Sequence, residues 1–276
     1  MTRFLSAKRL RWFAAAVVIV NGVFPALWIL FTSLKTEHEL TSKPITYWPE
    51  EPTLANFAAA FHDQPLLGFL INSLVVAGLS TLLSLFVSAL AAYAIARLKL
   101  RCRDLILTCI IAVSMFPLVT LMVPLFEIMR GIGLLNTYWA LVLPYTVLNL
   151  PICTLLMVSF FQDIPRDIEN AAMLDGCTRL GALWRIVLPL SAPGVATAGI
   201  LAFVNSWDEF LLSLSMNSAV AYRTLPVGIQ LYQGEFAFPW PIVSAALVVA
   251  IVPIVVLIVI FQEKVVSGLT SGGLKG

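Results

Sequence analysis

The sequence predicts an all-α membrane protein with six transmembrane helices, and three observations lead to this fold class. First, 60% of the 276 residues are hydrophobic and 12% are charged, whereas soluble domains carry roughly 25% charged residues. Second, the chain contains six long apolar windows without a charged residue. Third, the basic residues gather between alternate windows, as they do on one side of a membrane. We therefore expect residues 1–276 to form a single transmembrane domain.

Each apolar window is long enough to cross a bilayer, whose hydrocarbon core needs about 20 residues of helix. The windows lie at residues 12–34, 64–96, 105–126, 131–162, 186–207 and 236–262. A seventh apolar run, residues 210–222, is too short to cross. We expect it to extend the fifth helix or to fold back at the outer surface. Prolines within the windows predict kinks, which suit a bundle that encloses a cavity.

The positions of lysine and arginine predict the orientation of the chain. All but four of the 17 basic residues fall in residues 1–11, 97–103, 166–185 and 263–276. The exceptions are Lys35, Lys43, Arg130 and Arg223. The basic side marks the cytoplasm, so we expect both termini there, with an N-tail at residues 1–11, an external loop at 35–65, a cytoplasmic loop at 163–189 and a C-tail at 263–276. The basic start resembles a signal peptide, but the long first window favours a retained anchor.

Several classes of function are disfavoured by the composition. A net charge of +2 gives no reason to expect nucleic acid as a partner. The four cysteines have no metal-ligand spacing, and His38 and His62 form no zinc motif, so we expect no metal. The chain has no Gly-Lys pair, and therefore no phosphate-binding loop for ATP. The windows contain no paired Ser/Lys, His/Glu or Asp/Asp residues, which argues against an intramembrane enzyme.

The loop at residues 163–189 is the most informative part of the sequence. Pro165 favours a helix start, and Asp167 and Glu169 fall in the first turn, where the helix dipole favours anions. Gly176 can adopt the left-handed conformation that ends a helix. We therefore expect a short helix, a tight turn and a second helix that leads into the fifth span. On physical grounds alone, this segment is either an amphipathic connector at the membrane surface or a docking site.

The residue spacing of this loop resembles the EAA loop of the inner-membrane permeases of binding-protein-dependent ABC importers. The matching residues are Asn170-Ala171-Ala172, then Gly176, then Ile186-x-Leu188-Pro189. The loop departs from the family pattern at Asn170, where the family usually has Glu. Further segments resemble the carbohydrate-importer branch, close to the maltose-type second permease, and they are residues 32–35, 71–73, 91–97, 115–117, 223–228 and 261–276.

This resemblance implies that the loop helix is a coupling helix, seated in a groove of an ATPase subunit. The implied ATPase-coupling residues are Glu169, Asn170, Ala171, Ala172, Asp175, Gly176 and Pro189. The C-tail is implied to reach the ATPases as well, through the candidate contacts Gly268, Thr270, Gly273 and Lys275.

The resemblance also implies the partners and the location. The partners would be a second permease subunit in a heterodimer, two ATP-binding cassette subunits, an extracytoplasmic solute-binding protein and membrane lipid. ATP and magnesium would bind to the cassette subunits, so this chain itself is expected to hold no cofactor and to have no enzymatic activity. The implied location is the bacterial inner (plasma) membrane, which the chain crosses several times.

Polar residues near the outer end of the fifth span are the candidates for the translocation path. Ionisable groups at membrane depth are costly and therefore suggest a pathway. The candidates are Asn205, Trp207, Asp208 and Glu209, with Asn72 and Asn149 as weaker members of the same kind. The alternative is that these side chains lie at the outer interface or contact the partner permease. The external loop, with Tyr47 and Trp48, is either a contact for the solute-binding protein or a solvated connector.

The function that these observations predict is ATP-driven import of a sugar or sugar-like solute by alternating access. One alternative is the same machinery carrying glycerol phosphate esters. It would favour a basic lining, which the windows lack, although the partner permease could supply one. A second alternative is a self-sufficient secondary carrier or channel, which would need no EAA-type loop.

Overall fold

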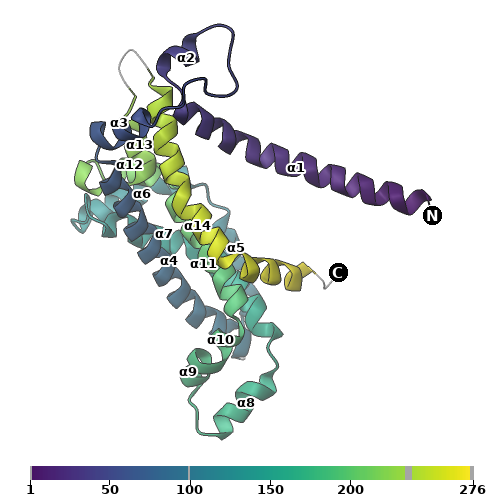
Figure 1. Ribbon diagram of the computed structural model, residues 1–276. Helices are drawn as coiled ribbons and strands as arrows, with labels where there is room; N and C mark the ends of the chain where they lie inside the picture. Colours follow the sequence, from purple (N-terminus) through teal and green to yellow (C-terminus); the bar gives the residue numbers. More distant parts are fainter. Residues whose placement is uncertain (1, 99, 234–237, 274–276) are drawn as a thin grey trace. The chain divides into compact units, whose positions relative to one another are not determined.

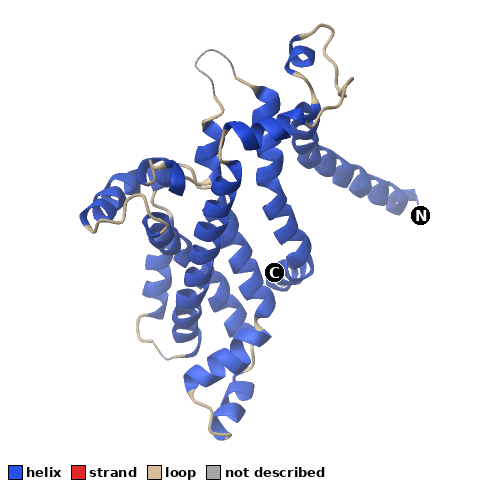
Figure 2. Ribbon diagram, turned by 60° about the vertical axis from the view of Figure 1, so that its left-hand side comes forward, coloured by secondary structure: helices blue, strands red, loops and turns tan. Residues whose placement is uncertain are grey.

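The computed structural model describes residues 2–98, 100–233 and 238–273. Helices and the loops between them make up the whole of the described part, which contains no strand (Figure 2). The chain divides into two compact units. The first unit comprises Met1–Leu67 and Gly228–Val252, and the second comprises Gly68–Val227 and Pro253–Gly276.

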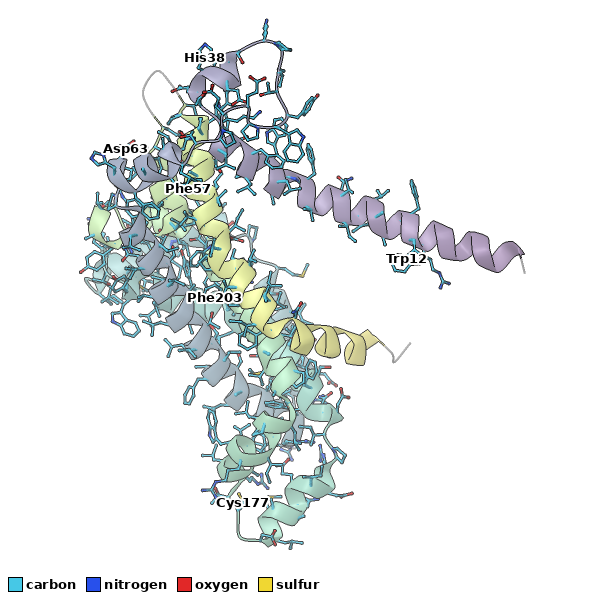
Figure 3. All side chains as sticks on the ribbon, in the orientation of Figure 1. Trp12, His38, Phe57, Asp63, Cys177 and Phe203 are labelled. Carbon is cyan, nitrogen blue, oxygen red and sulfur yellow. The ribbon has the colours of Figure 1, made fainter. Side chains whose placement is uncertain are left out.

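The first unit begins with α1 (Thr2–Leu34), an apolar helix that passes the length and hydropathy requirements for a membrane span from Arg11 onward. In the most apolar 18-residue stretch of this span, none of the residues is buried within the chain. Figure 3 shows the Trp12 side chain projecting from this helix. The apolar surface of α1 is therefore left for lipid or for another chain to cover.

The loop that follows α1 is held by buried polar contacts around α2 (Glu37–Thr41) and α3 (Ala55–Asp63). The Lys35 ammonium is buried and donates to the Thr46 carbonyl oxygen and to Thr46 Oγ1, the latter at 3.0 Å. Thr46 Oγ1 in turn donates to Glu39 Oε1 at 2.6 Å. Asn56 Nδ2 donates to the carbonyl oxygens of Ser33 and Lys35, each at 2.8 Å. These bonds fix the loop against the end of α1.

Aromatic contacts fasten the same loop to α1. The Trp48 ring lies 4.5 Å from the Phe31 ring, and the Tyr47 ring lies 6.2 Å from the Trp28 ring, in each case between ring centroids. Tyr47 and Trp48 nevertheless remain 70% exposed. Amphipathic rings in this position are typical of the membrane–water interface.

The second unit is a bundle built around α7 (Trp139–Asp163), which packs against α5 (Arg103–Ser114) and α11 (Ala192–Trp207). One apolar cluster joins α4 (Leu66–Arg97), α7 and α11 through small residues such as Ala92 and Ala198, which let helix backbones approach closely. A second cluster gathers around Tyr145 and includes α12 (Leu211–Met216). These contacts order the polar side chains described below.

Four helical spans are continuous and correspond to predicted windows: Arg11–Leu34, Leu66–Arg97, Trp139–Asp163 and Trp240–Gln262. The last belongs to α14 (Trp240–Gly273). The fourth span begins at Trp139, later than the predicted residue 131, because a turn with Asn136 at φ +58° precedes it. The first, second and sixth windows agree closely with the structure.

The other two windows were predicted as single spans kinked at prolines, and the structure divides each of them into two helices at a sharp bend. The third consists of α5 and α6 (Leu118–Gly131), which meet at 92°. Pro117 lacks an N–H group and disfavours helical backbone at the residue before it, so the helix ends there. The fifth is bent by 83° between Arg179–Leu190 and Ala192–Trp207. If each bent pair is one span, the described part of the chain has the six predicted spans.

Residues 210–222 do not extend the fifth helix, which excludes the first of the two alternatives predicted for them. They form the separate helix α12, which packs against α6 and α7, and a 3-10 turn at Val220–Tyr222. The short helix α13 (Leu225–Gln230) follows.

The predicted helix–turn–helix at residues 163–189 is confirmed. It consists of α8 (Arg166–Leu174), a turn with Gly176 at φ +87°, and α9 (Arg179–Ala182). A π-helical turn (Leu183–Val187), which we did not predict, and α10 (Leu188–Leu190) then lead to the bend before α11. Figure 1 shows α8 and α9 side by side near α10.

Candidate functional site

The helix α8 is polar and exposed, with one buried residue, Glu169. Pro165 precedes it in an extended conformation, as the sequence predicts for a helix start. At the other end of α8, Leu174 is 89% exposed.

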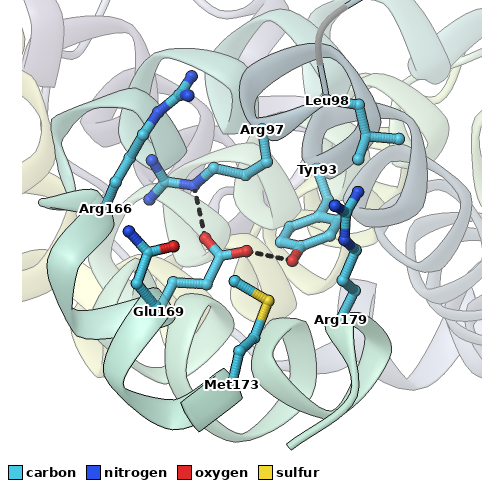
Figure 4. Close-up of a pocket in the computed structure, with 8 residues that line it drawn as sticks. Tyr93, Arg97, Leu98, Arg166, Glu169, Met173 and Arg179 are labelled. Atoms are coloured by element: carbon cyan, nitrogen blue, oxygen red, sulfur yellow. Dashed lines mark hydrogen bonds and ion pairs between the residues drawn. The ribbon is translucent and has the colours of Figure 1, made fainter.

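The buried carboxylate of Glu169 faces the end of α4. Its Oε2 lies 3.0 Å from Arg97 Nε, and both side chains of this ion pair are less than 10% exposed. Its Oε1 accepts a hydrogen bond from the Tyr93 hydroxyl (Figure 4). Tyr93 and Arg97 are four residues apart and therefore share one face of α4. A charge is tolerated in such a place only when it is paired in this way.

Two further contacts tie the same elements together. Arg97 Nη2 donates to the Ile164 carbonyl oxygen at 3.0 Å, and Ile164 is the residue at which α7 ends. Arg166 Nη2 donates to the Ala96 carbonyl oxygen at 3.4 Å. The ends of α4 and α7 and the start of α8 thus meet around one arginine. A cavity of about 620 Å³ opens beside them, lined by Tyr93, Arg97, Leu98, Arg166, Glu169, Asn170, Met173 and Arg179.

The remaining predicted coupling residues surround this point. Asn170 and Ala171 are exposed on α8, Asp175 and Gly176 are exposed in the turn, and Ala172 is half-buried. Pro189 is exposed in α10, before the bend into α11.

Of the predicted C-tail contacts, Gly268, Thr270 and Gly273 belong to α14. Lys275 lies outside the described residues.

A second polar site lies between α7 and α11, where the sequence predicted the translocation path. The cavity there has a volume of about 240 Å³ and is lined by Leu118, Tyr145, Leu148, Asn149, Asn205, Ser206 and Glu209. It therefore brings together three of the predicted path residues, Asn149, Asn205 and Glu209. None of the lining side chains is cationic.

Amide and hydroxyl groups form a connected network in this cavity. Asn149 Nδ2 donates to Ser206 Oγ at 2.9 Å, and Asn205 Nδ2 donates to Asn149 Oδ1 at 3.4 Å. Ser80 Oγ, on α4, donates to Ser206 Oγ at 3.0 Å. Asn149 is buried, whereas Asn205 is exposed although it belongs to an apolar helix. An exposed amide on a span is expected to face a polar pathway rather than lipid.

Glu209 has a structural role as well as a place in the cavity. Its Oε2 accepts a hydrogen bond from the Tyr145 hydroxyl at 2.5 Å. Its carboxylate also accepts from the backbone N–H groups of Leu212 and Ser213, at 3.0 and 3.3 Å, and so satisfies the free donors at the start of α12. The acid that the sequence assigned to the path thus also fixes α12.

The other predicted path residues lie apart from this cavity. Asn72 Nδ2 donates to the carbonyl oxygens of Ala221 and Arg223, both at 2.9 Å, and Asn72 Oδ1 accepts from the Tyr138 hydroxyl at 2.8 Å. Trp207 is buried and stacks on Phe203 at 5.6 Å. Asp208 lies just beyond α11, where the neighbouring protein atoms partly desolvate its carboxyl and so raise the pKa above the usual value.

Sequence reasoning missed Tyr93 and Arg97 at the first site and Tyr145 at the second. The signal for them was present, since Tyr93 and Arg97, like Tyr145 and Asn149, are spaced four residues apart and so lie on one helix face. Among the described residues, no group of three or more His, Cys, Asp or Glu side chains is arranged to hold a metal ion.

Comparisons with known proteins agree with this architecture. Residues 84–271 match the family model described as binding-protein-dependent transport system inner membrane component. The chain is 71% identical over 276 residues to the sulfoquinovosyl glycerol transport system permease protein SmoH of Agrobacterium fabrum, covering 100% of this chain and 97% of the relative. It is 36% identical over 265 residues to the trehalose/maltose transport system permease protein MalG of Thermococcus litoralis, covering 95% of each.

A solved structure shares the fold. It is a bacterial ABC transporter involved in the import of the acidic polysaccharide alginate, and it superposes with a TM-score of 0.80 at 20% identity. The match covers 93% of this chain and 97% of that chain.

Proposed function

The chain belongs to the family of binding-protein-dependent transport system inner membrane components, and from this premise we propose that it is the membrane subunit through which ATP hydrolysis drives import of a sugar or sugar-like solute. It is a permease, and the chemistry of ATP belongs to two partner ATP-binding cassette subunits, which hold ATP and magnesium. A second permease subunit completes the membrane part, and an extracytoplasmic solute-binding protein delivers the solute. The location is the bacterial inner membrane, with both termini in the cytoplasm.

The observation that carries this proposal is the construction of α8. A short helix with an exposed outer surface, including Leu174, is fastened to the bundle by the buried Glu169–Arg97 pair. Such a helix can transmit force because it presents one side to a partner and holds the bundle with the other. We propose that α8 is the coupling helix, docked in a groove of an ATPase subunit. Closure of the two ATPases would then shift the bundle between inward-open and outward-open packings.

The cavity around Asn149, Asn205 and Glu209 supports a solute path at the other site. Amides and a carboxylate are suitable hydrogen-bond partners for hydroxyl groups, and Tyr145 adds an aromatic surface. Asn205 is exposed, and the second permease would close the cavity on its open side. We propose that Asp208, just beyond α11, lies at the mouth of this path and that Trp207 supports it by stacking.

The chemistry of the cavity favours the hydroxyl-bearing part of a solute. Its lining contains a carboxylate and no cation, so it would repel a sulfonate or a phosphate. Relatives that carry sulfoquinovosyl glycerol and trehalose or maltose support a sugar-like solute. If the solute is acidic, we propose that its acidic group binds to the partner permease. No observation favours glycerol phosphate esters over sugars.

The test is uptake by proteoliposomes that contain this chain, its partner permease and the two ATPases. Radiolabelled sulfoquinovosyl glycerol and trehalose, each presented with its binding protein, serve as the solutes. We expect uptake of at least one of them to require ATP and to cease without the ATPases. Uptake by this chain alone, without ATP, would instead identify a self-sufficient carrier and overturn the proposal.

A further inference from the structure

The coupling helix α8 is joined to the bundle by two kinds of connection. The chain itself links it to α7 at Ile164 and, through the turn and α10, to α11. Side chains link it to α4, which is distant in sequence: Tyr93 and Glu169 are 76 residues apart. The second link is made at the one buried position of α8.

The side-chain link is built to resist separation. The Arg97–Glu169 pair is almost fully shielded from water, so the charges attract each other more strongly than a surface pair would. Removal of either partner would leave the other charge buried and unpaired. The Tyr93 hydroxyl donates a hydrogen bond to the other carboxylate oxygen of Glu169. Arg97 at the same time donates to the Ile164 carbonyl oxygen at the end of α7. One carboxylate thus fixes the position of α8 relative to two spans.

We infer that Glu169 is a positioning residue that makes α8 and the Arg97 end of α4 move as one body during transport, so that α4 is a second mechanical route from the ATPases to the solute path. This inference rests on the proposed function, since it specifies how the coupling helix acts. Glu169 therefore faces the bundle, and the ATPase contact belongs to the exposed residues of α8.

The far part of α4 reaches the solute cavity, as such a route requires. Ser80 Oγ donates to Ser206 Oγ, and Ser206 lines the cavity. A helix rises about 1.5 Å per residue, so Ser80 lies roughly 25 Å along α4 from Arg97. Because α4 is continuous from Leu66 to Arg97, a displacement of its Arg97 end is carried along its length to this contact.

The first experiment compares two Glu-to-Gln variants in the reconstituted importer. Glu169→Gln removes the charge that holds Arg97 while keeping the shape of the side chain. Glu127→Gln on α6 is the matched control, because it makes the same change in an exposed Glu–Arg pair, with Arg130, that lies outside the coupling helix. We expect Glu169→Gln to lower the number of solutes imported per ATP hydrolysed by about three- to tenfold, and Glu127→Gln to leave this ratio unchanged. A solely structural role for Glu169 would reduce the amount of assembled complex without changing the ratio.

The second experiment does not depend on how stable the first variant is. Leu98, directly after the end of α4, and Met173 on α8 line the same cavity (Figure 4). A cysteine at each can be joined by a short linker that a reducing agent cleaves. Each single-cysteine variant controls for the modification itself, and the native cysteines are replaced beforehand. If the two elements move together, the linked importer retains ATP-driven uptake. Loss of uptake on linking that is restored by reduction would overturn the inference.

The outcomes for the inference and for the proposed function are separable. Absence of ATP-dependent uptake by the wild-type complex would contradict the proposed function. If the wild-type complex is active, an import ratio for Glu169→Gln equal to that of Glu127→Gln would contradict the inference alone. If Glu169→Gln does not assemble, the linking experiment decides.

Discussion

Gly194 on α11 offers a sharp test of how the two central helices of the bundle pack. A Cβ atom built on Gly194 would lie 2.2 Å from both Cγ and Cδ2 of the Phe160 ring on α7. Gly199, one and a half turns further along α11, has more room: the nearest atom to its Cβ would be Leu85 Cδ1 at 3.2 Å. Gly194→Ala and Gly199→Ala therefore make the same chemical change on the same helix in two different steric environments.

The expected loss of stability in Gly194→Ala follows from these distances. Non-bonded carbon atoms rest about 3.5–4.0 Å apart, so the Phe160 ring or α11 would have to move by more than about 1 Å to admit the methyl group at Gly194. Overpacking of this kind costs about 1–3 kcal/mol. Alanine also favours a helix over glycine by up to about 1 kcal/mol. Because both variants share that gain, the difference between them isolates the steric cost, and we expect Gly194→Ala to be about 1–3 kcal/mol less stable than Gly199→Ala.

Thermal unfolding of the purified complex in detergent measures this difference. At about 2–4 °C per kcal/mol, Gly194→Ala should unfold roughly 2–12 °C below Gly199→Ala. Adding Phe160→Ala should remove the penalty, so the double variant should show a favourable interaction energy relative to the two single variants. Equal Tm values for the two glycine variants would refute the reasoning, because α7 and α11 would then not pack as the structure has them.

Three further predictions concern the functional segments. Gly176→Ala should destabilise the turn after α8 by about 1–2 kcal/mol, because only the backbone at φ +87° opposes the new methyl group, and ATP-driven uptake by the reconstituted importer should fall. Asn205→Leu should raise the KM for solute severalfold with assembly unchanged, whereas Leu201→Ala, an exposed position one turn earlier on α11, should not; equal KM values would exclude Asn205 from the path. The hydrogen bond from Thr46, aided by the Lys35 ammonium, holds the pKa of Glu39 below its usual 4.5, so the carboxylate stabilises the loop above that pH and this contribution is lost as the pH falls through the lowered pKa. The protection of residues 36–53 against hydrogen exchange, corrected for the pH dependence of the intrinsic exchange rate, should therefore fall on acidification in the wild type, and should already be lower at neutral pH in Glu39→Gln.

Composition and charge were sufficient to predict the spans, and prolines predicted kinks within them, but the sequence did not predict the angles of the bends. Apolar windows depend on side-chain transfer energies, which are local properties of the sequence. Pro117 signals an interruption, yet the 92° angle at that place is set by how α5 and α6 pack on their neighbours. The same holds for the 83° bend before α11 and for the π-helical turn that precedes it. Both are tertiary effects that local sequence patterns do not encode.

At the candidate sites, the sequence predicted which residues take part better than it predicted where their side chains point. Glu169 was expected in the first turn of a helix, where any acid is favourable, and its inward orientation depends on Arg97 from another span. Glu209 was expected in the translocation path, and in the structure its carboxylate also accepts a hydrogen bond from the backbone at the start of α12. Both cases need knowledge of which helices are neighbours, which spacing along one chain does not provide.

The contacts between α4 and α7 bear on where the bundle can flex. Ser84 Oγ donates to the Thr146 carbonyl oxygen at 3.2 Å, and Thr154 Oγ1 donates to Ser88 Oγ at 3.1 Å, so small polar groups join these helices along their length. Arg97 extends the same connection to the end of α7. A pair fastened at so many points resists internal shear, because each bond would have to break in an apolar surrounding without water to replace it. Relative movement is therefore expected where helical hydrogen bonding is already interrupted, at the bend between α10 and α11 and at the break between α5 and α6.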